Sequence, residues 1–214
     1  GPLLAAAIDI NDEKGQKVFD ILLASANGEH EVGQMGRHII GAFTMSARTD
    51  AWEYIEKLLL AAQREEGLRQ SILEAIDEGH PDIFPRFLRL VLEHKLERFS
   101  ATVRAVDVWF GFLWDAMSAC KAREIIETAL KFLDAPDLAA QAIAAAKALP
   151  APAAVKTKGK KLADPAAEVE PAFIALWTLA FRDVNTAIPQ AVPLLDSPHP
   201  DVRFIATHFL DMIG

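Results

Sequence analysis

Two short motifs pair a histidine with an aspartate, the residue types from which general acid–base sites are often built. They are His80-Pro81-Asp82 and His199-Pro200-Asp201. Proline and aspartate are also typical of the first turn of a helix. We therefore interpret both motifs as turns that open helices, and we assign no catalytic residue to the chain.

Other residues that could carry chemistry are scattered along the chain. His30 and His38 lack the i,i+4 spacing that places two metal ligands on one helical face, and no CxxC motif occurs. The glycines between residues 28 and 36 match no nucleotide-binding fingerprint. Cys120 is the only cysteine, which excludes an internal disulfide and suits a reducing compartment. We expect neither a metal nor a cofactor, and we favour a binding function over an enzymatic one.

The composition limits the kinds of molecule that the protein is expected to bind. The 214 residues are 51% hydrophobic, enough for a substantial core, and the net charge is −8. Charged residues interrupt every apolar run before it reaches membrane-spanning length. An acidic chain repels a phosphate backbone, so a nucleic-acid partner is disfavoured. These features predict a cytoplasmic protein that does not bind membranes and whose partner is another protein.

The stretch Leu96–Ser118 is the longest run without a helix breaker, and we predict that it forms the central helix of the fold. Its apolar residues recur at steps of three and four, as one helical stripe requires. A second apolar stripe, which includes Val108 and Trp109, lies beside the first. A helix that is apolar on two sides must be covered on two sides, so we expect it in the interior, with Trp109 in the core.

One face of this predicted helix mixes charges with an aromatic ring beside a glycine. It holds Arg104, Asp107, Gly111, Trp114 and Asp115. Glycine inside a helix costs about 1 kcal/mol relative to alanine, so a compensating contact is expected. Two interpretations remain open. Either a neighbouring helix packs closely at Gly111 while Arg104 pairs with Asp107, or the face is a groove in which a partner protein contacts Trp114.

Helical spacing recurs throughout the chain, and strand-like alternation is nearly missing. Asp50 and Glu53 have the spacing of a capping box, and Glu53 and Lys57 that of an exposed ion pair. Residues 150–163 are rich in proline, alanine and lysine, and we predict a flexible loop there. Around a dozen helices joined by tight turns are typical of a helical-repeat array, so we predict one helical-repeat domain over residues 1–214.

Two segments of the chain match each other without gaps, LDAP at residues 133–136 and LDSP at residues 195–198. The second lies within the segment Pro193–Gly214, which resembles the HEAT repeat because a proline-containing turn is followed by Asp201-Val202-Arg203 at the start of a helix. In that family a turn aspartate and an arginine of the second helix bond between adjacent repeats. The resemblance therefore implies a repeat-stacking role for Asp196 and Arg203, although Ser197 occupies the usual aspartate position.

The segments RFSATVRAVDVWFGFLWD and FIALWTLAFRDVNTAIPQAVPLLDSPHPDVRFIATHFL also resemble a group of large bacterial proteins of unknown function. Together these features predict an all-α solenoid of stacked HEAT-like helix pairs that acts as a protein-interaction scaffold. The alternative is a HEAT-like DNA glycosylase that acts on alkylated bases. Its candidate residues would be Trp109, Trp114, Asp107 and Asp115, and it would need a basic groove.

The last helix of the sequence carries apolar residues on more than one side, among them Phe204, Phe209 and Met212. Repeat arrays usually finish with an atypical repeat whose outer side is polar. We therefore expect this helix to expose an apolar patch through which the chain associates with itself.

Overall fold

The computed structural model describes residues 2–10, 13–26, 34–62, 65–111, 117–152 and 165–214. Throughout these ranges the regular structure is helical, with twelve α-helices and no β-strand, which confirms the predicted all-α class. Contacts within the chain gather into two compact units, unit 1 (Gly1–Ala105) and unit 2 (Val106–Gly214). The predicted single domain over residues 1–214 stays a prediction. The predicted loop at residues 150–163 lies, from residue 153 on, outside the described residues.

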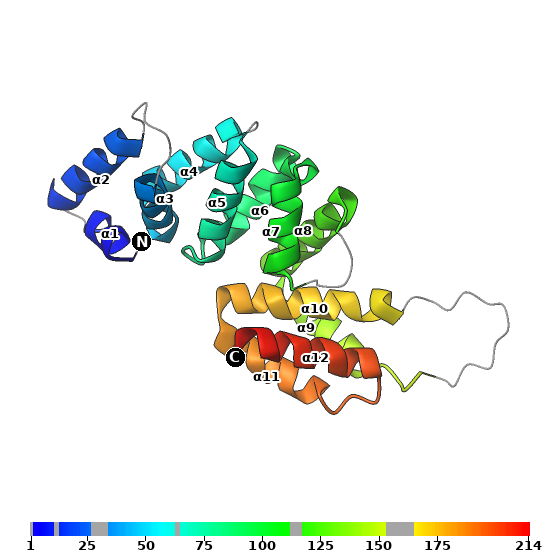
Figure 1. Ribbon diagram of the computed structural model, residues 1–214. Coiled ribbons are helices and arrows are strands. Elements are labelled where there is room, and N and C mark those ends of the chain that lie inside the picture. The colour runs from blue at the N-terminus through cyan, green and yellow to red at the C-terminus, as the bar shows by residue number, and fades with distance from the viewer. Residues whose placement is uncertain (1, 11–12, 27–33, 63–64, 112–116, 153–164) are drawn as a thin grey trace. The chain divides into compact units, whose positions relative to one another are not determined.

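Unit 1 contains six complete α-helices and the first part of a seventh (Figure 1). They are α1 (Pro2–Ile8), α2 (Glu13–Ala26), α3 (Gln34–Met45), α4 (Thr49–Ala61), α5 (Glu66–Asp77), α6 (Ile83–Glu93) and α7 (Ser100–Trp109), with the 3₁₀ helix η2 (Leu96–Arg98) before α7.

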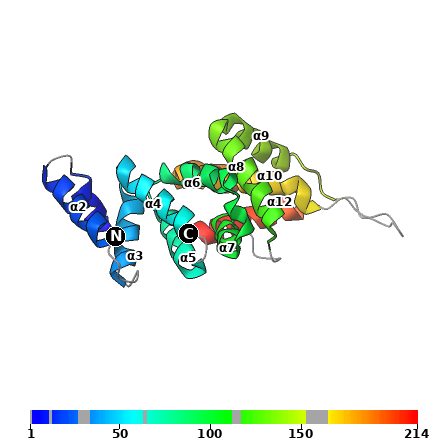
Figure 2. The ribbon, with the colours of Figure 1, turned by 90° about the horizontal axis from the view of Figure 1, so that it is seen from above.

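Helices of unit 1 pack on their second neighbours as well as on their sequence neighbours. Helix α3 contacts both α1 and α5, and α4 contacts α6. In Figure 2, α3 and α5 accordingly lie in one row while α4 and α6 lie in the other. Each helix turns an apolar stripe toward these contacts, so that Phe43, Ile55, Ile72 and Phe87 are fully buried. Alternate helices of unit 1 are thus stacked upon one another.

A buried arginine joins α5 to the segment that follows η2. The Arg69 side chain is fully buried, and its Nη2 donates a hydrogen bond to the Ala62 carbonyl (2.9 Å). Its guanidinium carbon lies 3.9 Å from the centroid of the Phe99 ring, a cation–π contact. Burial lowers the pKa of Arg69, and this stacking offsets part of the cost of desolvating the charge.

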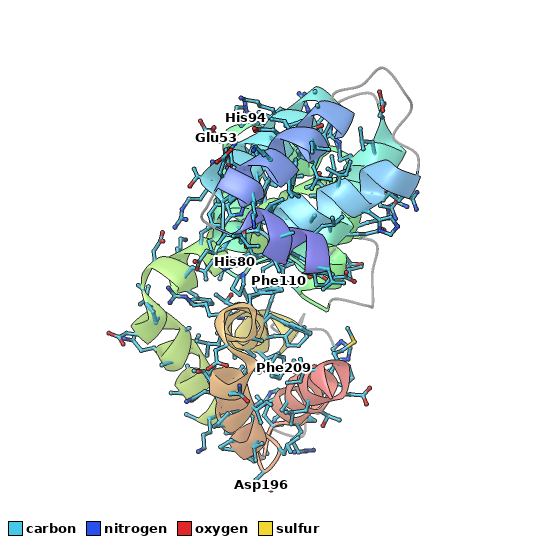
Figure 3. The ribbon with its side chains drawn as sticks, turned by 90° about the vertical axis from the view of Figure 1, so that its left-hand side faces the viewer. Glu53, His80, His94, Phe110, Asp196 and Phe209 are labelled. Carbon is cyan, nitrogen blue, oxygen red and sulfur yellow. The ribbon has the colours of Figure 1, made fainter. Side chains whose placement is uncertain are left out.

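Unit 2 is organised around a single long helix. It contains α8 (Ala119–Asp134), α9 (Pro136–Lys147), α10 (Pro165–Arg182), α11 (Val184–Ala191), the 3₁₀ helix η3 (Val192–Leu194) and α12 (Pro200–Ile213). Helix α10 contacts α8, α9, α11 and α12. All residues from Ala172 to Thr178 are buried, so this helix is covered on every side. In Figure 3, Phe110 and Phe209 lie on two different sides of α10, which is seen nearly end-on.

The helix predicted over Leu96–Ser118 is wrong. The stretch forms η2, then α7, and α7 ends at Trp109, while α8 begins only at Ala119. Gly111 has a φ of +63°, a left-handed conformation that a continuing α-helix cannot contain. Trp109 is 3% exposed, which confirms its place in the core, whereas Val108 is 62% exposed and does not extend the predicted second stripe.

Candidate functional site

The face predicted for the Leu96–Ser118 helix has two charged residues that the structure describes, Arg104 and Asp107. These two do not pair with each other. The Arg104 guanidinium is exposed and lies 3.6 Å from the carboxylate of Glu66 in unit 1. Asp107 is half-buried, and its Oδ1 has no hydrogen-bond partner in the described structure. The expected Arg104–Asp107 pair is therefore wrong: Arg104 has Glu66 beside it instead.

The other half of that face falls outside the described residues, which include neither Trp114 nor Asp115. Gly111 itself supports the close-packing interpretation, because an added Cβ would lie 3.0–3.2 Å from three ring atoms of Trp177. His208 Nε2 also donates a hydrogen bond to the Gly111 carbonyl (2.7 Å). For the glycosylase alternative, Trp109 is buried and so unavailable to stack on a base.

Replacing Asp107 with asparagine is expected to raise the melting temperature at pH 7. Burial raises the pKa of the Asp107 carboxyl, so the folded state binds its proton more tightly than the unfolded state. The stability that this group contributes is therefore lost as the pH rises through the folded-state pKa. Asp107→Asn removes this ionisable group. The increase in melting temperature should therefore shrink toward zero below about pH 4. Melting curves recorded from below about pH 4 up to pH 7 test this prediction. An increase in melting temperature that is the same at every pH would contradict it.

Both His-Pro-Asp motifs open helices, as predicted. The Nδ1 atom of His199, the N-cap residue of α12, accepts a hydrogen bond from the Asp201 amide (3.3 Å). The Nδ1 atom of His80 accepts one from the Asp82 amide in the same way, just before α6 (3.3 Å). In each motif the ring nitrogen acts as a local acceptor for backbone amides at the start of a helix.

The predicted repeat-stacking residues lie in the turn before α12 and on α12 itself. Arg203 Nη1 donates a hydrogen bond to the Ser197 carbonyl (2.7 Å), so the arginine contacts the position where the HEAT family has aspartate. Asp196 is exposed and points away from the rest of unit 2 (Figure 3). The stacking role of Asp196 and Arg203 stays a prediction.

A groove lies between α2 and α4 in unit 1, and several polar side chains line it. It consists of two cavities, each with a volume of about 520 Å³. Asp50 and Glu53 line both cavities, so the two adjoin along α4. We call this feature the α2/α4 groove; Figure 3 shows Glu53 at the surface of unit 1.

Arg48 organises the polar end of the groove. Its Nε and Nη2 donate to the two carboxylate oxygens of Asp50 (2.9 and 2.7 Å), and Nη2 also donates to Gln16 Oε1 (2.7 Å). Its Nη1 donates to the Ile8 carbonyl (3.2 Å), and its guanidinium covers the Phe19 ring at 4.3 Å. The hydrogen bond from Arg48 lowers the pKa of Asp50, which therefore stays ionised well below neutral pH.

Asp9 also lines the polar end of the groove. One of its carboxylate oxygens accepts a hydrogen bond from the Ser46 hydroxyl, and the other accepts one from the Ala47 amide (3.2 Å). These bonds tie the end of α1 to the turn between α3 and α4. The polar end is thus built by contacts between residues about forty positions apart in the sequence.

The second cavity makes the other end of the groove apolar. Phe19 and Leu23 of α2 face Tyr54 and Leu58 of α4 across it. Burial raises the pKa of Tyr54, and its ring packs edge-on against Phe43 with the centroids 5.4 Å apart. The Tyr54 hydroxyl has no hydrogen-bond partner among the described residues, which leaves it able to donate to a ligand.

The sequence indicated the residues of this groove but assigned them other roles. Asp50 is the second residue of α4 and binds Arg48 instead of capping the helix, whose N-cap residue is Arg48. Glu53 and Lys57 are exposed and form no ion pair with each other in the described structure, contrary to our expectation. A groove lined by two free and opposite charges follows only from how α2 and α4 are placed.

Two further properties of the described residues limit what the protein can do. No group of three or more histidine, cysteine, aspartate or glutamate side chains there is arranged to hold a metal ion. None of the described helices combines the length and the apolar composition needed to cross a membrane. Cys120 is a free and exposed thiol near the start of α8.

The fold makes this an all-α protein assembled from packed helices, with a groove in unit 1 as its candidate site. The whole chain, residues 1–214, matches a family of unknown function, DUF5724, and the protein belongs to that family. No curated protein and no solved structure matches the chain.

Proposed function

We propose that this protein is a protein-interaction scaffold built from HEAT-like helix pairs in a solenoid arrangement. The observation that carries the proposal is the α2/α4 groove, which lies between two stacked helix pairs and joins an apolar floor to a charged rim. Surfaces of this kind bind segments of other proteins without any catalytic group.

The packing pattern supports the helix-pair part of the proposal. In unit 1, α3 lies between α1 and α5, and α4 packs on α6; in unit 2, α10 lies between α8 and α12. Such contacts between second neighbours are what stacked helix pairs produce, because a repeat buries its face against the next. Up-and-down bundles instead surround one shared core.

Site-specific crosslinking in cells tests the scaffold function. A photoreactive residue at Lys57, which lines the groove, should capture a discrete partner protein. The same residue at Lys131, an exposed position of α8, is the matched control. The captured protein is then purified and titrated against the wild-type chain by calorimetry. Direct binding that competes with crosslinking at Lys57 supports the proposal, and equal capture at both positions or failure of the purified proteins to bind contradicts it.

We also propose that the chain associates with itself through α12. Met212 is 46% exposed and can report on a surface contact, whereas Phe209 is fully buried and cannot. Met212→Glu should lower the average mass measured by light scattering at high concentration. Thr207→Glu, which adds the same charge at an exposed polar position of α12, should not. A wild-type chain that stays monomeric throughout the concentration series would contradict the proposal.

A further inference from the structure

We propose that the α2/α4 groove binds a protein segment that carries a basic side chain next to an apolar one. The inference rests on the scaffold function proposed above and specifies the chemistry of its partner. It follows from three properties of the groove: where its charges lie, which of them are already paired, and where its apolar floor begins.

The polar end of the groove carries an excess of negative charge. The carboxylates of Asp9, Asp50 and Glu53 line this cavity, and Arg48 is its only lysine or arginine among the described residues. Three carboxylates against one guanidinium leave a formal charge of −2 at this end. Asp20, close enough to raise the pKa of Arg48, adds a further carboxylate near the site.

The one cation at this end is already committed to internal contacts. All three nitrogens of the Arg48 guanidinium donate hydrogen bonds, to Asp50, Gln16 and the Ile8 carbonyl. Glu53, in contrast, is exposed and has no hydrogen bond or ion pair within the described structure. An incoming anion would therefore meet unpaired carboxylate, while an incoming lysine or arginine would find an acceptor in Glu53.

The apolar end fixes what must lie beside that basic side chain. Phe19, Leu23 and Leu58 line it, so burial of an apolar side chain of the partner against them would stabilise the complex. Tyr54 can donate its phenolic hydrogen to a backbone carbonyl of the segment. Glu53 lines both cavities, so the basic and apolar side chains of the segment must also be close together.

The same charges argue against the other occupants of such a groove. Lys57 lines the second cavity, but at the polar end the phosphate groups of a nucleic acid or of an anionic lipid surface would face the carboxylates of Asp9, Asp50 and Glu53. An apolar segment that lacks a cation would fill only the second cavity. A segment with a basic and an apolar side chain satisfies both ends.

Fluorescence anisotropy with designed peptides tests this inference on the full chain. The probe is a labelled helical peptide with two leucines at i,i+4 and flanking lysines, and its partner probe has glutamates in place of the lysines. We expect the lysine peptide to bind roughly tenfold or more tightly than the glutamate peptide, with the preference weakening as salt is raised. A third peptide, with serines in place of the leucines, should lose binding to a similar degree.

Charge-reversal variants of the chain test whether the peptides bind in the α2/α4 groove. Glu53→Lys should weaken the lysine peptide and strengthen the glutamate peptide, reversing the preference. Glu124→Lys makes the same charge change at an exposed position of α8 in unit 2 and should leave both affinities unchanged. Circular dichroism confirms that each variant is folded, and Glu53 is exposed, so its replacement should not disturb the core.

The outcomes separate this inference from the function on which it rests. Equal binding of the lysine and glutamate peptides, no binding of either, or no effect of Glu53→Lys would overturn the proposed partner chemistry. If crosslinking at Lys57 then still captured a partner through a neutral or acidic segment, the scaffold function would stand alone. If neither experiment showed binding at the groove, both proposals would fall.

Discussion

Replacing Phe209 with alanine is expected to lower the free energy of unfolding by about 3–5 kcal/mol. The Phe209 side chain is fully buried, and its ring packs edge-on against Trp177 of α10 with the centroids 5.1 Å apart. Truncation removes this contact and leaves a cavity beside the helix that organises unit 2. Urea unfolding monitored by circular dichroism measures the change.

The same helix supplies the control for this prediction. Phe204 is 50% exposed and stacks on the His208 ring at the surface of α12. Phe204→Ala should change the free energy of unfolding by only about 0.5 kcal/mol, as is usual for surface positions. Similar losses for Phe204→Ala and Phe209→Ala would mean that the structure assigns the buried face of α12 incorrectly.

The helical class was predictable because it depends on local spacing, but the central helix was not identified correctly. The stretch from Pro171 to Phe181 contains no charged residue, and this signal of burial on all sides marks α10. Leu96–Ser118 carries charged residues such as Arg104 and Asp107 but no proline, and nothing in its own spacing shows that α7 ends at Trp109. Just after this helix end, Gly111 lies against Trp177 and its carbonyl is hydrogen-bonded to His208. Both residues are more than sixty positions further along the chain.

The candidate site was not predictable for a related reason. Helices α2 and α4 each have an ordinary amphipathic pattern, and a groove arises only because the space between them is not filled. Arg48 was not singled out from the sequence, since its partners Gln16 and Ile8 lie 32 and 40 residues earlier. Capping-box and i,i+4 rules describe isolated helices, and here tertiary contacts gave Asp50 and Glu53 other surroundings.

Replacing Gly111 with alanine is expected to destabilise the protein through two separate effects. A φ of +63° costs an L-residue about 1–2 kcal/mol relative to glycine. The added Cβ would also lie 3.0 Å from Cζ2 of Trp177, and accommodating such overpacking typically costs a further 1–3 kcal/mol or so. Denaturant unfolding should therefore show a lower midpoint with an unchanged slope.

Gly41→Ala is the matched control, because Gly41 lies inside α3 and an added Cβ there would meet nothing within 4 Å. Alanine is the better helix former, so this variant should raise the free energy of unfolding by about 0.5–1 kcal/mol. The same chemical change thus has opposite signs at the two positions. A neutral or stabilising Gly111→Ala would show that the turn after Trp109 does not need a left-handed residue, and the interruption of the predicted Leu96–Ser118 helix would then require a different cause.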